Sequence, residues 1–126
     1  MDREILIQYA DMIEEVKDIR KRIEKLGKEV EKLNRKTPDS ERKVTALTRW
    51  QKTLESKEIE LLELTCQVEE YIETIQTSEL RTMFRLYYID LLPWWKVAQQ
   101  MNRIFPKRKY TEDSCRIRHE RFFKKV

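Results

Sequence analysis

Residues 5 to 33, ILIQYADMIEEVKDIRKRIEKLGKEVEKL, contain the apolar repeat that decides the fold of the first half of the chain. The repeat advances by alternating steps of three and four residues, which keeps one narrow seam turned towards a partner helix. Every position of the repeat is apolar: Ile5, Tyr9, Met12, Val16, Ile19, Ile23, Leu26, Val30 and Leu33. The stretch therefore predicts a long helix over about residues 3–35, of which the seam covers roughly 43 Å.

A second repeat follows, and it predicts the partner helix over about residues 38–76. Its positions are Leu47, Trp50, Leu54, Lys57, Leu61, Leu64, Val68, Tyr71 and Ile75, of which only Lys57 is polar. In the polar segment between the repeats, Thr37 can cap the second helix and Pro38 can occupy its first position. Two seams joined by a short loop favour an antiparallel hairpin within one chain. Self-association through the same seams, giving a homo-oligomer, satisfies the pattern as well.

The composition favours helices throughout the chain. The 126 residues include one glycine and three prolines, and 40% of them are charged, so the turn residues that sheets require are scarce. No stretch has the eighteen or more consecutive apolar residues of a membrane span, and the charged N-terminus does not resemble a signal peptide. We expect an all-α protein of the cytoplasm with no membrane partner.

Catalysis and metal binding find little support in the sequence. Cys66 and Cys115 are far apart and His119 is the only histidine, so a four-ligand metal site cannot be assembled from them. A single glycine, Gly27, excludes a glycine-rich phosphate loop, and no nucleophile and base form a pair. The cysteines are best explained as small apolar residues in a reducing compartment. We expect no enzyme activity, no metal and no cofactor.

Positive charge is concentrated at the C-terminal end. Residues 1–76 carry a net charge of −3 and residues 77–102 a net charge of +1, whereas residues 103–126 contain nine basic and three acidic side chains, a net charge of +6. Localised positive charge beside helices is typical of a surface that neutralises phosphates, although a solubilising tail has the same composition. The basic side chains are Arg103, Lys107, Arg108, Lys109, Arg116, Arg118, Arg121, Lys124 and Lys125.

Residues 77–126 form a second predicted domain, distinct from the hairpin of residues 1–76. Thr77 or Ser78 can begin a short helix with an aromatic face, and Pro93 can begin the next, whose apolar positions include Val97 and Ala98. Trp94 is predicted to lie in the core, with the alternative that Trp94 and its neighbour form a stacking platform for single-stranded nucleic acid. Thr111 caps a final helix over about residues 112–125. The order is that of a small three-helix helix-turn-helix domain.

The final helix has two unlike faces. At 100° per residue, Cys115, His119, Phe122 and Val126 share one face, and His119 is predicted to be a hydrogen-bonded core residue. The opposite face offers charged groups for base edges and phosphates and an aliphatic group for a thymine methyl. A solvated amphipathic helix is the alternative. That opposite face contains Asp113, Ser114, Ile117, Glu120, Arg121 and Lys124, flanked by Arg116 and Arg118.

Several short stretches of the last fifty-five residues resemble small phage-encoded proteins of Gram-positive bacteria. These proteins join a helical hairpin to a helix-turn-helix similar to sigma-factor region four, and they include or neighbour the late transcription regulators of the RinA and ArpU type. Two positions depart from the family pattern: Tyr87 replaces an arginine, and Leu91 replaces a turn glycine. The stretches are Tyr71–Ile75, Glu79–Arg81, Tyr88–Asp90, Trp94–Ala98, Tyr110–Arg116 and His119–Phe122.

The resemblance implies binding to double-stranded DNA, with the final helix in the major groove. It implies base contacts from Asp113, Ser114, Arg116, Ile117, Glu120 and Arg121. Phosphate contacts are expected from Arg103, Lys107, Arg108, Lys109, Arg118, Lys124 and Lys125, the first four of them in a wing-like loop.

The sequence thus predicts sequence-specific DNA binding in phage or prophage transcriptional control, with host RNA polymerase as a further partner by analogy and with association to the nucleoid. Two alternatives stay open. A phage small terminase subunit also joins a helix-turn-helix to helical oligomerisation elements and would recognise a packaging site. A coiled-coil adaptor would instead use the hairpin to bind another helical protein.

Overall fold

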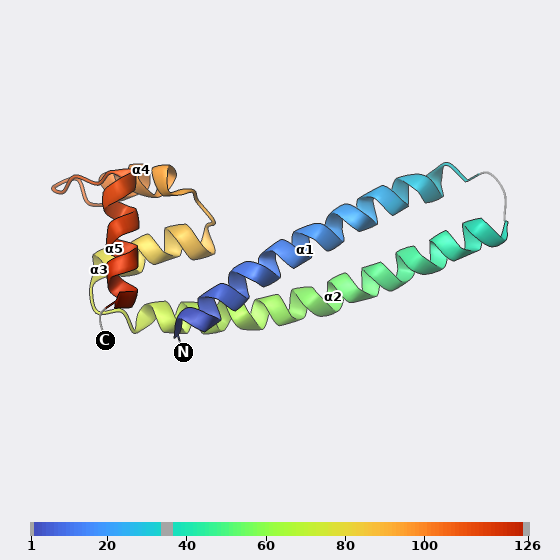
Figure 1. Ribbon diagram of the computed structural model, residues 1–126, viewed down its shortest axis with the longest axis horizontal. Coiled ribbons are helices and arrows are strands. Elements are labelled where there is room, and N and C mark those ends of the chain that lie inside the picture. Colours follow the sequence, from blue (N-terminus) through green and yellow to red (C-terminus); the bar gives the residue numbers. More distant parts are fainter. Residues whose placement is uncertain (1, 34–36, 125–126) are drawn as a thin grey trace. The chain divides into compact units, whose positions relative to one another are not determined.

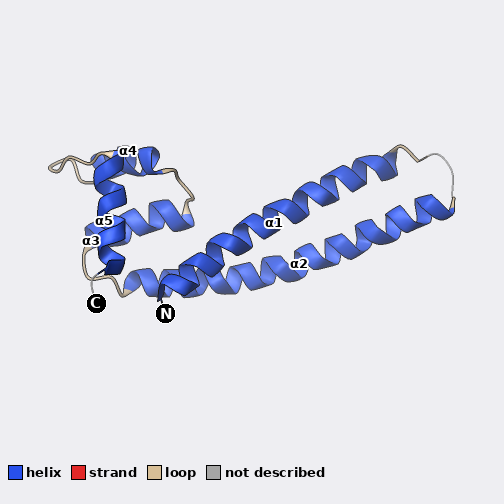
Figure 2. Ribbon diagram, viewed as in Figure 1, coloured by secondary structure: helices blue, strands red, loops and turns tan. Residues whose placement is uncertain are grey.

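The computed structural model describes residues 2–33 and 37–124, and within these ranges it contains helices and connecting loops but no strand (Figure 2). The predicted all-α class is confirmed. Two long helices come first, followed by shorter ones. In chain order they are α1 (Asp2–Glu31), α2 (Pro38–Glu73), α3 (Ser78–Phe84), the π-helix η1 (Arg85–Ile89), α4 (Trp94–Ile104) and α5 (Glu112–Lys124).

The chain divides into two compact units, Gln8–Leu64 and Met1–Ile7 together with Thr65–Val126. In the first unit, which we call the hairpin unit, α1 and α2 run antiparallel and side by side (Figure 1). Ion pairs cross from one helix to the other: Arg20 lies 3.4 Å from Glu58. Lys57, the polar member of the second seam, lies 3.7 Å from Glu15. All the described seam positions of both helices are buried or half-buried.

The seam of α1 is wider than the strict repeat predicts. Leu6 and Ile13 are buried, whereas their neighbours Ile5 and Met12, which the repeat selects, are half-buried. A straight α-helix has 3.6 residues per turn, so a seven-residue repeat drifts around it by about 20° per heptad. Residues beside the ideal seam therefore enter the buried face.

Hydrogen bonds at the ends of α2 show why the helix begins and ends where it does. Thr37 Oγ1 accepts from the Ser40 backbone N–H at 3.1 Å, and Ser40 Oγ accepts from the Thr37 N–H at 2.8 Å, so the predicted cap is confirmed. At the other end, Thr74 Oγ1 donates to the Tyr71 carbonyl at 2.6 Å. This side-chain bond competes with helix continuation, and α2 ends at Glu73.

The second unit, which we call the aromatic unit, has a core built from α3, η1, α4 and α5. Met83, Val97, Ala98, Met101 and Cys115 are buried in it, as the spacing predicts for the α4 residues. Thr77 caps α3 by accepting from the Leu80 N–H.

The π-helical turn of η1 has not been predicted from the sequence. The Asp90 N–H donates to the Arg85 carbonyl at 2.9 Å, a bond across five residues in place of four. The wider turn accommodates buried Leu86 together with Tyr87 and Tyr88, which both contact the core rings.

Two positions singled out in the sequence have distinct structural roles. Leu91 has a φ of 58°, the left-handed conformation that favours glycine, so the leucine there is strained. Tyr87 stacks on Trp94 with ring centroids 3.9 Å apart and planes 12° apart. Trp94 is thus packed against the core, while Trp95 is exposed.

Candidate nucleic-acid interface

Helix α5 begins at a reciprocal cap. Thr111 Oγ1 accepts from the Ser114 N–H at 3.1 Å, and Ser114 Oγ accepts from the Thr111 N–H at 2.9 Å. Ser114 Oγ also donates to the Thr111 carbonyl at 3.0 Å. The predicted cap is confirmed, and the Ser114 hydroxyl, which we expected at a base edge, is used to fix the start of the helix.

The inward face of α5 joins an aromatic cluster. Cys115 and His119 are buried there, and Phe122 is half-buried against Phe84 with ring centroids 5.1 Å apart. Burial raises the pKa of the Cys115 thiol, so the thiol stays protonated and unreactive. Val126, placed on this face by the sequence, lies outside the described residues.

His119 is the buried polar centre of this cluster. Its Nε2 lies 2.5 Å from the Tyr88 hydroxyl, which agrees with the predicted hydrogen-bonded role. Its Nδ1 lies 3.3 Å from Glu120 Oε1 without meeting hydrogen-bond geometry. Burial lowers the pKa of His119 against the opposing effect of Glu120, and burial likewise raises the pKa of Tyr88. Both groups are therefore neutral near pH 7.

The outward face of α5 is an exposed, mostly cationic row. Asp113, Ile117, Arg121 and Lys124 follow one another at steps of four, four and three residues, and Arg116 lies three residues after Asp113, so the side chains share one side of the helix. Arg116 pairs with Glu112 at 3.0 Å and with Asp113 at 3.4 Å, both in the first turn of the same helix. Such exposed pairs are weak and exchange readily for phosphate or a base edge. The row consists of Asp113, Arg116, Ile117, Arg121 and Lys124.

Glu120, predicted as a base contact, lies beside the start of α1. Arg3 is 3.7 Å from Glu120, and its guanidinium carbon lies 4.8 Å from the centroid of the Phe123 ring. The first turn of α1 therefore braces the C-terminal half of α5. Glu120 is half-exposed and could still meet a ligand, but in the free protein it has a partner of opposite charge.

The loop between α4 and α5 is closed by one asparagine. Asn102 Oδ1 accepts from the Tyr110 N–H at 2.8 Å, and Asn102 Nδ2 donates to the Tyr110 carbonyl at 2.9 Å. Three of the predicted phosphate contacts, Arg103, Lys107 and Lys109, are exposed and have no ion-pair partner among the residues that the structure describes. The prediction that Arg103 lies in the loop is wrong, because α4 continues to Ile104. The loop is thus a short basic segment with fixed ends, not an extended wing.

The remaining two arginines of the predicted phosphate set share one carboxylate. Glu79, in the first turn of α3, accepts from Arg108 of the loop and from Arg118 of α5. Its side chain is 13% exposed. The guanidinium carbon of Arg118 also lies 5.2 Å from the centroid of the Tyr110 ring. The sequence does not predict this pairing, because the partners of Glu79 are 29 and 39 residues away.

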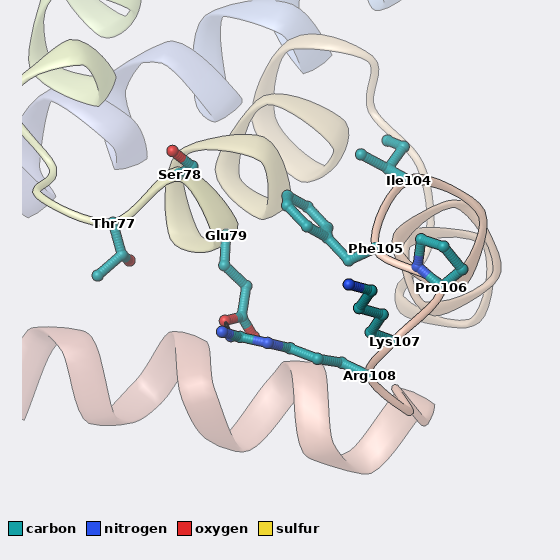
Figure 3. A pocket seen from close by; sticks show the side chains of 8 residues that line it. All are labelled: Thr77, Ser78, Glu79, Ile104, Phe105, Pro106, Lys107 and Arg108. Atoms are coloured by element: carbon teal, nitrogen blue, oxygen red, sulfur yellow. Dashed lines mark hydrogen bonds and ion pairs between the residues drawn. The ribbon is translucent and has the colours of Figure 1, made fainter.

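A cavity of 450 Å³ lies beside this carboxylate, and Figure 3 shows Glu79 and Arg108 pointing towards one another at its edge. Its walls combine apolar side chains with basic ones. They are Thr77, Ser78, Glu79, Ile104, Phe105, Pro106, Lys107 and Arg108.

A metal centre is absent from the described part of the chain. No three His, Cys, Asp or Glu side chains gather there to hold a metal ion. Within the same residues, no helix is long and apolar enough to cross a membrane. Lys125, predicted as a phosphate contact, lies outside the described residues.

The fold and this surface define a class: an all-α protein with a long helical hairpin and a small helical unit that exposes a cationic helix face. Comparison with known protein families, curated proteins and solved structures found no match to the chain.

Proposed function

We propose that the protein binds double-stranded DNA with sequence specificity, inserting α5 into the major groove. One observation carries the proposal: α5 buries one face among aromatic rings and exposes Asp113, Arg116, Ile117, Arg121 and Lys124 on the other. Guanidinium groups donate to guanine, carboxylates accept from cytosine, and an aliphatic side chain contacts the thymine methyl. The row therefore combines groups for three kinds of base edge.

The cations around this row support the same function. Arg103 at the end of α4 and Lys107 and Lys109 of the loop are exposed, and they precede α5 in the sequence, where they can neutralise phosphates without reading bases. The proposed role is transcriptional control of phage or prophage genes, without catalysis, in a protein associated with the nucleoid. Contact with host RNA polymerase belongs to the same proposal and rests on fold analogy alone.

The test begins by selecting bound fragments from random duplex DNA at physiological salt. We expect a defined motif, and we expect Arg116→Ala and Arg121→Ala each to weaken binding to it by about 10- to 100-fold. The single variants Arg42→Ala and Arg49→Ala each remove the same charge from an exposed position of α2 and serve as the controls. The proposal is wrong if the α5 variants bind the selected site as tightly as the controls do.

A second candidate function, that of a coiled-coil adaptor, is favoured by one feature of the hairpin unit. Ile59 and Leu62 on α2 are 58% and 67% exposed, and they lie three residues apart on one helix face. A helical partner could cover them. Failure to bind any duplex at low salt, together with capture of a helical protein that Ile59→Ser abolishes, would favour the adaptor. A ring of many subunits by light scattering would instead favour a terminase subunit.

A further inference from the structure

We propose that Glu79 limits the affinity and the salt dependence of duplex binding by withholding Arg108 and Arg118 from phosphate. This inference rests on the proposed function. It concerns a positioning residue, because Glu79 acts through the two arginines and lies in α3, outside the helix proposed to read bases.

The geometry of the carboxylate supports this role. Each of its oxygens accepts from a different arginine: Oε2 from Arg108 and Oε1 from Arg118. Hydrogen bonds between ionised groups are roughly twice as strong as neutral ones. The Glu79 side chain is largely buried, so water and salt screen these pairs less than they screen the exposed pairs of Arg116. Arg108 and Arg118 are therefore held more firmly than other cations of the proposed interface.

The arrangement lowers the electrostatic part of duplex binding. Non-specific affinity comes almost entirely from cations that displace counterions from phosphates, and each phosphate contacted adds about 0.9 to the slope of log K against log salt. Arginines held by Glu79 contribute little to that slope. Affinity for a non-specific duplex is therefore lower, and depends less on salt, than the positive charge alone would give.

Two neighbouring basic residues of the loop allow a cation paired with Glu79 to be compared with one that is unpaired in the described part of the chain. Arg108 and Lys109 are adjacent, both exposed and of equal charge, but only Arg108 is bound to Glu79 among the residues described. If Glu79 withholds Arg108, Lys109→Gln lowers the salt slope for non-specific duplex by about 0.9, and Arg108→Gln lowers it by less than about half of that. Equal reductions in the two variants would overturn the inference.

Removing the carboxylate is the complementary experiment. Glu79→Gln keeps the shape of the side chain and frees both arginines, so the salt slope for non-specific duplex rises by up to about 1.8. Affinity for the non-specific duplex at low salt rises with the slope. Glu69→Gln, an exposed acid on α2, is the charge-matched control and leaves the slope unchanged.

A double-mutant cycle tests whether the effect passes through the arginines. In a background with Arg108→Gln and Arg118→Gln, Glu79→Gln changes the salt slope by no more than the Glu69→Gln control does. A full effect in that background would overturn the inference. Circular dichroism shows whether each variant folds. If Glu79→Gln does not fold, the comparison of Lys109→Gln with Arg108→Gln tests the inference instead. If wild type binds no duplex at low salt, the proposed function itself fails. If wild type binds a selected site but Glu79→Gln leaves the salt slope unchanged, only this inference fails.

Discussion

The hairpin unit and the aromatic unit bury their apolar side chains in different ways. Between residues 20 and 64, the described residues include no fully buried apolar side chain, and the seam there is a row of half-buried contacts with charged neighbours. In the aromatic unit, by contrast, Met83, Phe84, Val97, Met101 and Cys115 are completely buried. Residues 20–64 of the hairpin unit therefore depend on many small contributions, and the aromatic unit depends on a few large ones. Such differences in local packing lead to differences in local stability.

The largest expected effect comes from removing the central ring of the aromatic unit. Phe84 contacts Tyr88, His119, Phe122 and Phe123, so Phe84→Ala leaves a cavity among rings. We expect a loss of about 3–5 kcal/mol in the free energy of unfolding, measured by urea denaturation. Leu54→Ala in the half-buried seam is the comparison and is expected to cost about 1–2 kcal/mol. Equal losses would show that the two units do not differ in this way.

The next prediction uses the buried histidine to report on the aromatic unit alone. Burial holds the pKa of His119 below its ordinary value of 6.5, so the neutral form is favoured in the folded state. The free energy of unfolding is then fully present above pH 6.5. It falls as the pH drops from 6.5 towards the lowered pKa, because the unfolded chain gains a proton first.

Thermal unfolding between pH 7.5 and pH 5 measures this effect, since carboxylates titrate mostly below that range. The groups that face the ring are Tyr88, Glu120, Arg3 and the neighbouring aromatic side chains. His119→Gln removes the titrating group, and we expect the pH dependence in this range to disappear. A wild-type melting temperature that is constant over the range would contradict the prediction.

The sequence predicts the hairpin unit better than the aromatic unit, because local contacts leave a pattern in the sequence and distant contacts do not. The hairpin follows from local periodicity, and the caps at Thr37, Thr77 and Thr111 follow from side-chain chemistry at single positions. Contacts between distant segments leave no periodic signal. The contact of Arg3 with α5 and the pairing of Glu79 with two arginines are of this kind, and so they appear only in the fold.

The sequence predicts the two faces of α5. It does not predict which polar side chains on them already have partners within the protein. Periodicity separates the inward and outward faces of α5 correctly for Cys115, His119 and Arg121. It cannot tell that the Ser114 hydroxyl is used in the cap or that Arg118 is bound to Glu79. Charge and helical position predict which way a side chain points. Whether its hydrogen-bonding groups are available to a ligand depends on partners elsewhere in the chain.

A smaller effect is expected at the strained turn between η1 and α4. The left-handed conformation costs a non-glycine residue about 1–2 kcal/mol, and glycine in turn loses more freedom on folding. Leu91 is 48% exposed, so Leu91→Gly removes little packing and is expected to raise the free energy of unfolding by up to about 1 kcal/mol. Leu92→Gly, at a half-buried position that packs on the core, is the control and should destabilise. If both variants destabilise equally, the strain at Leu91 is negligible.

The smallest effect is expected at Lys57, the polar member of the hairpin seam. Its side chain is 30% exposed and lies near Glu15 and Glu60, so its ammonium group reaches water and carboxylates while its stem covers the seam. A polar residue at one seam position can fix which helix pairs with which, at some cost in stability.

Lys57→Leu should therefore raise the free energy of unfolding by less than about 1 kcal/mol and increase the tendency of the chain to self-associate. Light scattering and urea denaturation measure the two results. Lys52→Leu, an exposed position outside the seam, is the control, and a gain in stability there as large as at Lys57 would show that the seam position is not special.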